Sequence, residues 1–88
     1  EQKAATNRNK HGVSFEEAST VFDNPLARIF DDDGHSENEP REIIIGHSLN
    51  GRLLIVVFVE RIAGTVRIIS ARHATGREQQ EYEEHTKF

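Results

Sequence analysis

The chain has 88 residues and a formal net charge of −4, which is the size of one small domain over residues 1–88. It contains no cysteine, which excludes disulfides and thiolate metal sites. No apolar run approaches the roughly 20 residues of a membrane span, and no secretory signal is visible. We therefore expect a cytoplasmic protein without a membrane partner. Because the first residue is Glu1 rather than methionine, we also expect that the natural start lies upstream.

Basic residues are concentrated in one part of the chain. Residues 40–77 carry a local net charge of +4, although the whole chain is acidic. The six basic residues of this range are all arginines: Arg41, Arg52, Arg61, Arg67, Arg72 and Arg77. A guanidinium can donate two parallel hydrogen bonds to a phosphate, so this asymmetry favours a nucleic-acid-binding surface. Arginines that simply flank surface strands are the alternative.

Two helices are predicted at the N-terminus. Residues 1–10 are compatible with a helix, and Gly12 is placed to end it. Ser14 and Glu17 match the S-x-x-E capping box at the start of a second helix, which ends before Pro25. The apolar residues of this second helix have helical spacing and are expected to face a sheet: Phe15, Ala18, Val21 and Phe22.

Four strands are predicted in the middle of the chain. They cover residues 26–30, 41–48, 52–61 and 65–71. The acidic loop 31–40 does not match a calcium-binding loop and is expected to be a solvated connection. Asn50-Gly51 is a strong hairpin signal, and the last three strands are expected to form an antiparallel meander. The continuous apolar run of 52–61 indicates a central strand. In the last strand, alternation places Arg67 on the same face as Ile69.

The C-terminal segment, residues 73–88, is predicted to form a helix that is polar on almost every side. Only Ala74 and Tyr82 offer an apolar face near its middle. Such a helix is either weakly attached or held by specific polar contacts. The predicted fold class is α+β, with two N-terminal helices, a four-stranded, mainly antiparallel twisted sheet and a C-terminal helix.

Candidates for chemistry gather where the last strand meets this final helix. Glu78 and Tyr82 are four residues apart, so they share a helix face that can turn toward Arg67 or Arg72. These groups could cleave RNA without a metal. A base would take the ribose 2′-proton, an acid would protonate the leaving 5′-oxygen, and arginine would stabilise the charge on phosphorus. Alternatively, Thr75 and Glu78 form a capping box and Tyr82 is a packing anchor.

Three further residues enter the candidate set. Lys10 and His11 lie at a predicted helix end, where a histidine can transfer protons near neutral pH. A basic pair also suits the C-terminus of a helix for electrostatic reasons. Glu60, at the end of a buried strand, is either a base or half of a surface ion pair. The histidines are too scattered for a zinc site and no phosphate-binding loop is present, so we expect neither metal nor cofactor.

Four segments carry a resemblance to a known family: KHGVSFEEASTVFDNP, HSENEPREIIIGHS, GRLLIVVF and VRIISARHATGREQQEY. In this order they resemble the BrnT family of bacterial type II toxins over nearly the whole chain. The resemblance implies a RelE-like fold and a ribonuclease that cuts RNA and arrests growth. It also implies neutralisation by a ribbon-helix-helix antitoxin of the BrnA type. The complex would repress its own operon, so operator DNA would be contacted only through the antitoxin.

The leading hypothesis is therefore a metal-independent endoribonuclease toxin. On the resemblance, characteristic motif positions fall on Lys10, His11, Arg67, Arg72, Glu78 and Tyr82. The candidate catalytic residues are Arg67, Arg72, Glu78, Tyr82, His11 and Glu60. The candidate RNA-binding residues are Lys10, Arg52, Arg67, Arg72 and Arg77. The alternative is a non-catalytic protein-binding module that a partner chain completes. In either case the antitoxin is expected to cover the basic face of the sheet.

Overall fold

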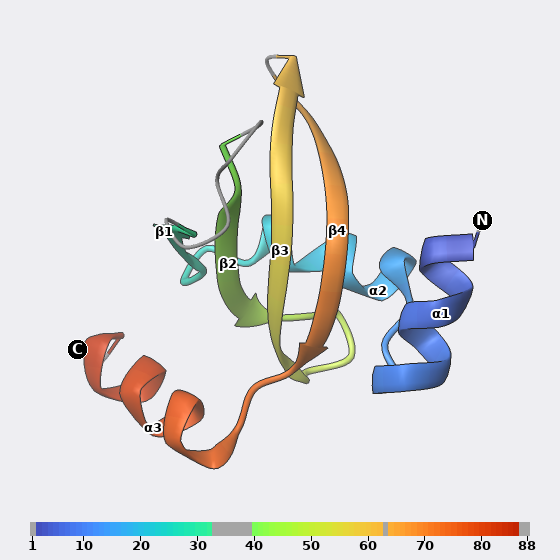
Figure 1. Ribbon diagram of the computed structural model, residues 1–88. Coiled ribbons are helices and arrows are strands. Elements are labelled where there is room, and N and C mark those ends of the chain that lie inside the picture. The colour runs from blue at the N-terminus through green and yellow to red at the C-terminus, as the bar shows by residue number, and fades with distance from the viewer. Residues whose placement is uncertain (1, 33–39, 63, 87–88) are drawn as a thin grey trace.

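The computed structural model describes residues 2–32, 40–62 and 64–86. In these residues the elements are α1 (Gln2–His11), α2 (Phe15–Ser19), a 3₁₀ helix η1 (Thr20–Asp23), β1 (Arg28–Asp31), β2 (Glu42–His47), β3 (Leu53–Ile62), β4 (Thr65–His73) and α3 (Gly76–His85). The described strands form one antiparallel sheet in the order β1-β2-β3-β4. Helix α1 lies beside β4, whereas α3 lies at the opposite side (Figure 1). The predicted α+β class, meander and C-terminal helix are confirmed.

Several predicted boundaries need correction. The second N-terminal helix is short and ends at Ser19, and its last predicted turn is the 3₁₀ helix η1. Strand β1 starts at Arg28 rather than Leu26, because Ala27 closes a turn by donating its N–H to the Asn24 carbonyl at 3.1 Å. Most of the predicted acidic loop, 33–39, lies outside the described residues.

The sheet has two covered faces. Its N-terminal face carries Leu54, Val56 and Phe58, which pack against residues of the N-terminal helices. Phe22 meets the Phe58 ring edge-on, with 4.9 Å between the ring centroids. The C-terminal face carries a smaller buried cluster of Ile45, Ile55 and Tyr82, the last from α3. Because successive side chains of a strand alternate between faces, the continuous apolar run of β3 supplies both clusters.

One buried side chain fastens α1 to the edge of the sheet. Asn7 donates from Nδ2 to the carbonyls of Val13 and Ala71, both at 2.8 Å. Its Oδ1 accepts from the Ala71 N–H at 3.0 Å. Asn7 therefore occupies the backbone groups of β4 that a further strand would otherwise use. Gly12, at φ +69°, ends the helix as predicted and turns the chain toward Val13.

A β-bulge changes which side chains of β4 share a face. Val57 pairs with Ser70, but the next residue of β3, Phe58, pairs with Ile68, so Ile69 is the extra residue. Strict alternation would place Arg67 and Arg72 on opposite faces, since they are five residues apart. The bulge instead pairs Arg67 with Val59 and Arg72 with Ile55, both on the C-terminal face. It thereby puts the two arginines on one side of the sheet.

Close packing at Gly46 brings the segment after η1 onto β2. A Cβ atom on Gly46 would lie 2.8 Å from the Cβ and 3.2 Å from the Cα of Ala27, which leaves room for glycine alone. The segment so positioned provides the Leu26 carbonyl, which receives a hydrogen bond from α3. Gly46 therefore contributes indirectly to the position of α3 on the sheet.

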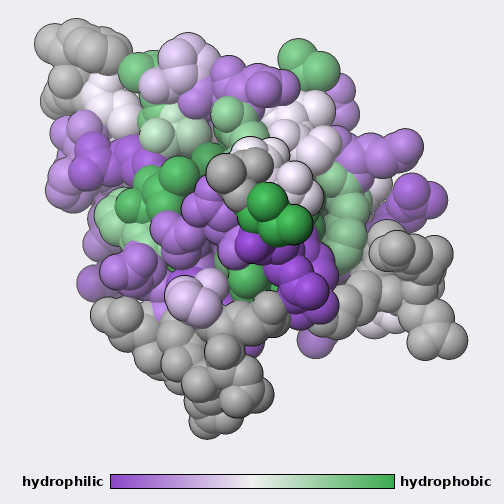
Figure 2. All heavy atoms as spheres, turned by 90° about the horizontal axis from the view of Figure 1, so that it is seen from above, coloured by the Kyte–Doolittle hydropathy of each residue, from purple (hydrophilic) through white to green (hydrophobic). Residues whose placement is uncertain are grey.

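The surface at the end of the sheet that carries the β3–β4 turn is mostly hydrophilic, with hydrophobic residues exposed between polar ones (Figure 2). Ile62, near this turn, is 75% exposed. None of the helices in the described part of the chain has the length and hydrophobicity that a membrane crossing requires.

Candidate functional site

A bidentate ion pair joins β4 to α3. Arg72 points from the C-terminal face of β4, and its Nη1 and Nη2 donate to Oε1 and Oε2 of Glu78 at 2.8 and 2.9 Å. The Arg72 side chain nevertheless remains 41% exposed. The carboxylate accepts the two parallel hydrogen bonds that a phosphate could also accept from this guanidinium. Arg72 is thus an accessible guanidinium in a fixed orientation.

Glu78 also closes the first turn of α3. Its Oε1 accepts from the Thr75 N–H at 2.8 Å, and its own N–H donates to Thr75 Oγ1 at 3.2 Å. The predicted capping box is confirmed. The hydrogen bonds from Arg72, followed by those from Thr75, lower the pKa of Glu78 to about 2. Glu78 is therefore ionised at neutral pH, and both of its oxygens are engaged.

Tyr82 anchors α3 on the sheet. It is buried, and its hydroxyl donates to the Leu26 carbonyl at 3.0 Å and lies 3.4 Å from Asn24 Oδ1. The His47 ring meets it edge-on at 5.7 Å between centroids. Burial raises the pKa of the Tyr82 phenol, which is consequently neutral near pH 7. The alternative of a packing anchor therefore has a defined structural basis.

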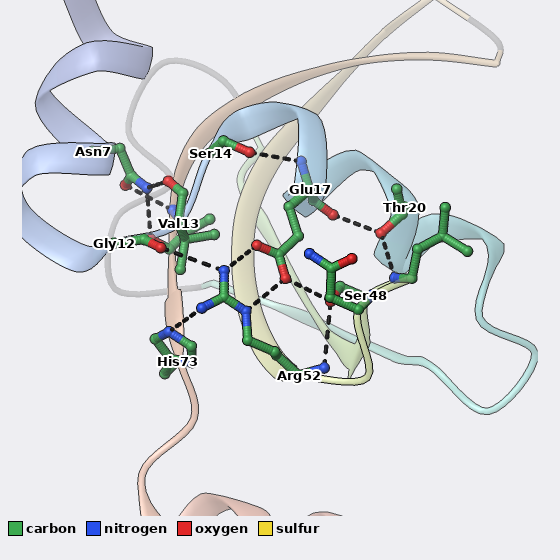
Figure 3. A network of polar contacts seen from close by, with 12 residues as sticks. Asn7, Gly12, Val13, Ser14, Glu17, Thr20, Ser48, Arg52 and His73 are labelled. Atoms are coloured by element: carbon green, nitrogen blue, oxygen red, sulfur yellow. Dashed lines mark hydrogen bonds and ion pairs between the residues drawn. The ribbon is translucent and has the colours of Figure 1, made fainter.

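A second guanidinium–carboxylate pair lies at the start of β3 (Figure 3). Arg52 donates from Nε to Glu17 Oε2 at 2.8 Å, and its Nη2 bonds Oε1 of the same carboxylate. Ser48 Oγ donates to Glu17 Oε2 at 2.7 Å. The hydrogen bonds from Arg52, followed by the one from Ser48, lower the pKa of Glu17 to about 2. Arg52 remains 39% exposed.

Arg52 brings three distant segments together. Its Nη1 lies 3.3 Å from His73 Nε2 at the end of β4, and its Nη2 donates to the Gly12 carbonyl after α1 at 3.4 Å (Figure 3). His73 directly follows Arg72, and Arg77 directly precedes Glu78. We call the cationic and titratable residues at this end of the sheet the basic end, in which Arg52 and His73 lie on the N-terminal face and Arg72 lies on the C-terminal face: Lys10, His11, Arg52, Arg72, His73 and Arg77.

Two predicted residues lie away from the basic end. Arg67 is exposed on the same face as Arg72, but its partner Val59 is four residues along β3 from Ile55, or about 13 Å. Glu60 pairs with Val66 and is exposed near the β3–β4 turn. The structure therefore does not bring Glu60 together with Arg72. Within the described ranges, no three His, Asp or Glu side chains lie close enough together to hold a metal ion.

Sequence reasoning missed three members of the Arg52 network. The predicted capping box required the Glu17 carboxylate to accept a hydrogen bond from the Ser14 N–H. The Glu17 N–H does donate to Ser14 Oγ at 3.0 Å, but the Glu17 carboxylate binds Arg52 and Ser48 instead. Ser48 and His73 carried no local signal at all. Arg52 lies 35 positions from Glu17 and 21 from His73, so no short motif records these contacts.

Comparison with protein families places the chain in a class of nucleases. Residues 1–78 match the family described as "Ribonuclease toxin, BrnT, of type II toxin-antitoxin system". The chain belongs to this family, so the resemblance seen in its sequence is confirmed. The match includes the sheet, the basic end and Glu78, and it stops before Tyr82. A search of individually curated proteins gives no match.

Proposed function

We propose that this chain is a toxin that cleaves RNA endonucleolytically without a metal ion and thereby inhibits translation and growth. The observation that carries the proposal is the basic end, where two half-exposed guanidinium groups, Arg52 and Arg72, are each oriented by a carboxylate. This group occurs in an acidic chain of a ribonuclease family. We further propose a cytoplasmic location, a RelE-like fold and a BrnA-type ribbon-helix-helix antitoxin, through which operator DNA would be contacted.

Arginine would supply the electrostatic part of catalysis. The Arg72 guanidinium would stabilise the charge that develops on the scissile phosphate, because it is held in place before the substrate arrives. Arg67, on the same face, would bind another phosphate of the same strand. Lys10, Arg52 and Arg77 would add sequence-independent attraction for the RNA backbone.

Proton transfer would fall to His11 rather than to the carboxylate or the phenol. Glu78 is a weak base because its pKa is about 2, and the Tyr82 hydroxyl already donates a hydrogen bond to a backbone carbonyl. His11 is half-buried at the end of α1, one residue before the Gly12 carbonyl that Arg52 contacts, so RNA bound by both His11 and Arg72 would have to pass over the end of the sheet. Glu78 would then be a positioning residue for Arg72, and Tyr82 would fix α3. Glu60 would need RNA to reach the opposite end of the sheet.

The test is RNA cleavage in EDTA by the wild type and matched arginine variants. We expect Arg72→Ala to lower kcat/KM about 10²-fold or more, because a preorganised charge in the transition state is lost. Arg61→Ala removes an exposed arginine at the other end of β3 and should stay within about twofold of the wild type. Circular dichroism would establish that both variants are folded.

Three results would contradict this proposal. Wild-type cleavage by Arg72→Ala would remove Arg72 from the mechanism, and cleavage that requires Mg²⁺ would refute metal independence. RNA that stays intact under all conditions, together with tight binding of an antitoxin, would instead favour the non-catalytic binding module.

A further inference from the structure

A pocket of about 340 Å³ opens between the C-terminal face of the sheet and α3. Its apolar lining comes from the strands and includes Ile43, Ile45 and Ile55. The α3 side contributes Glu78, Glu81, Tyr82 and His85. This volume is at the lower end of the range for ligand sites and suits one large side chain. The pocket is therefore an apolar hollow with a polar rim along one helix.

The helix that forms this rim is acidic. Between Gly76 and His85, α3 carries four glutamates and one arginine. Arg72 neutralises Glu78. The Glu81 carboxylate, in contrast, makes no hydrogen bond or ion pair with any other described residue. Arg28 adds a positive charge on the strand side, so the negative charge of the rim is confined to its α3 side, where it attracts a basic side chain.

A large aromatic side chain is exposed to solvent on the strand side of the pocket. Phe30 lies on the edge strand β1 and is 48% exposed, although it lines the pocket. The Arg28 guanidinium lies 5.8 Å from its ring centroid. Leu26, just before β1, is also 43% exposed. Exposed apolar side chains beside an apolar hollow are typical of protein-binding surfaces, in which a few central anchors carry most of the affinity.

We propose that the antitoxin docks in this pocket through an amphipathic segment. The segment inserts one large apolar side chain between Phe30 and the isoleucines, and it places a lysine or arginine beside Glu81. The apolar floor and the Glu81 carboxylate on the α3 side select this occupant, since they suit an amphipathic peptide with a basic side chain better than they suit a nucleic acid. The inference rests on the proposed function, because that function supplies the antitoxin as partner.

Docking there also explains how the antitoxin neutralises the toxin. The Glu78 side chain lines the pocket and holds Arg72 at the same time. A partner seated against Glu78 lies directly beside the Arg72 guanidinium. It covers the approach of a phosphate to Arg72 and keeps the ion pair closed. The antitoxin therefore needs no contact with the Arg52 network to block cleavage.

The experiment measures binding of the purified antitoxin from the same operon to the full chain, alongside RNA cleavage by the free toxin. Phe30→Ala and Glu81→Lys alter the pocket. Ile29→Ala and Glu84→Lys are the matched controls, because Ile29 pairs with Ile44 on the other face of β1 and Glu84 lies on α3 outside the pocket lining. We expect each pocket variant to raise the Kd at least about tenfold and each control to stay within about threefold.

The outcomes separate this inference from the proposed function. Weaker antitoxin binding with unchanged RNA cleavage by the free variants supports the docking site. Weaker antitoxin binding in a chain that never cleaves RNA also supports it, while refuting the ribonuclease proposal. Wild-type affinity in both pocket variants overturns the docking site. Reduced RNA cleavage with unchanged antitoxin affinity overturns it too, and assigns the pocket to the substrate. If the wild type fails to bind the antitoxin, the choice of occupant is wrong.

Discussion

Glu78 and Glu17 each hold an arginine, and this role fixes their protonation. Both carboxylates have a pKa of about 2, below the ordinary value of 4.5, because an arginine donates hydrogen bonds to them. Neither group changes charge near neutral pH. In the proposed function, their contribution is the orientation of Arg52 and Arg72, which are long, partly exposed side chains.

The Glu78→Gln variant separates positioning from proton transfer. We expect kcat/KM to fall about tenfold because Arg72 loses its charged partner and its fixed orientation. The shape of the pH profile between pH 5 and 8 should stay unchanged, since Glu78 titrates far below this range. Glu84→Gln, an exposed change on the same helix, serves as the control. Loss of one limb of the profile in Glu78→Gln would show that Glu78 transfers a proton.

The same carboxylates make stability depend on acid. The folded-state pKa of Glu17 lies below its unfolded value, so its ion pair stabilises the fold fully above about pH 4.5 and is lost as the pH falls toward 2. We expect the urea midpoint of the wild type to drop between pH 5 and 2. Glu17→Gln should be less stable than the wild type at pH 7 and should lose less on acidification. If the urea midpoints of the two proteins fell in parallel with pH, the lowered pKa of Glu17 would be contradicted.

At the scale of elements, side-chain contacts attach the two long helices to the sheet. Helix α1 is fastened to β4 through Asn7, and α3 is fastened through the Arg72–Glu78 pair and the Tyr82 hydroxyl. This explains why a helix with so few apolar residues as α3 keeps a fixed place. The composition of α3 allowed either a weakly attached helix or one held by specific polar contacts, and the structure shows the second.

Removing the Asn7 side chain should loosen α1 selectively. Asn7→Ala leaves the N–H and the carbonyl of Ala71 buried without partners, so we expect a loss of about 3 kcal/mol in the free energy of unfolding. Thr6→Ala is the matched control, because Thr6 is an exposed residue of the same helix. Urea denaturation measures both variants. Equal stability of Asn7→Ala and the wild type would mean that water or a neighbouring group replaces the amide.

At the scale of the whole molecule, charge is separated in space. Lys10, Arg52, Arg72 and Arg77 lie where α1 and β4 end and where β3 and α3 begin, whereas the rest of α3 presents glutamates beside the pocket on the C-terminal face. A net charge of −4 therefore coexists with a local concentration of positive charge. The two charged regions suit two partners of opposite charge, RNA and a basic antitoxin segment.

This separation predicts a modest dependence of RNA affinity on salt. If the five basic side chains proposed to contact RNA each neutralise a phosphate, the slope of log K against log salt should be about −3.5 for single-stranded RNA. Lys10→Ala should make the slope shallower by about 0.7. Titration of a 2′-O-methyl RNA, which cannot be cleaved through its 2′-oxygen, measures binding alone. An unchanged slope in Lys10→Ala would exclude Lys10 from the contact.

The sequence predicted the elements better than it predicted the contacts between them. Strand alternation and turn residues identified the meander, because these signals are local. Arg72 and Glu78 were also recognised as a pair of candidates, since they are close in the chain. The β-bulge at Ile69 could not be predicted, because VRIIS reads as a regular strand. The Glu17–Arg52 pair joins residues 35 positions apart, and only the folded chain brings them together.

The hydrogen bonds between Asn7 and Ala71 also have a consequence for folding during synthesis on the ribosome. These two residues are 64 positions apart in the chain, so α1 leaves the ribosome long before the backbone that it must grip has been made. Contacts of such long sequence separation form late, because the intervening chain must first be ordered. Until β4 has been synthesised, α1 has no strand to hold and the basic end does not exist. If Arg52 and Arg72 act on RNA as proposed, the nascent chain acquires this site only after β4 has emerged.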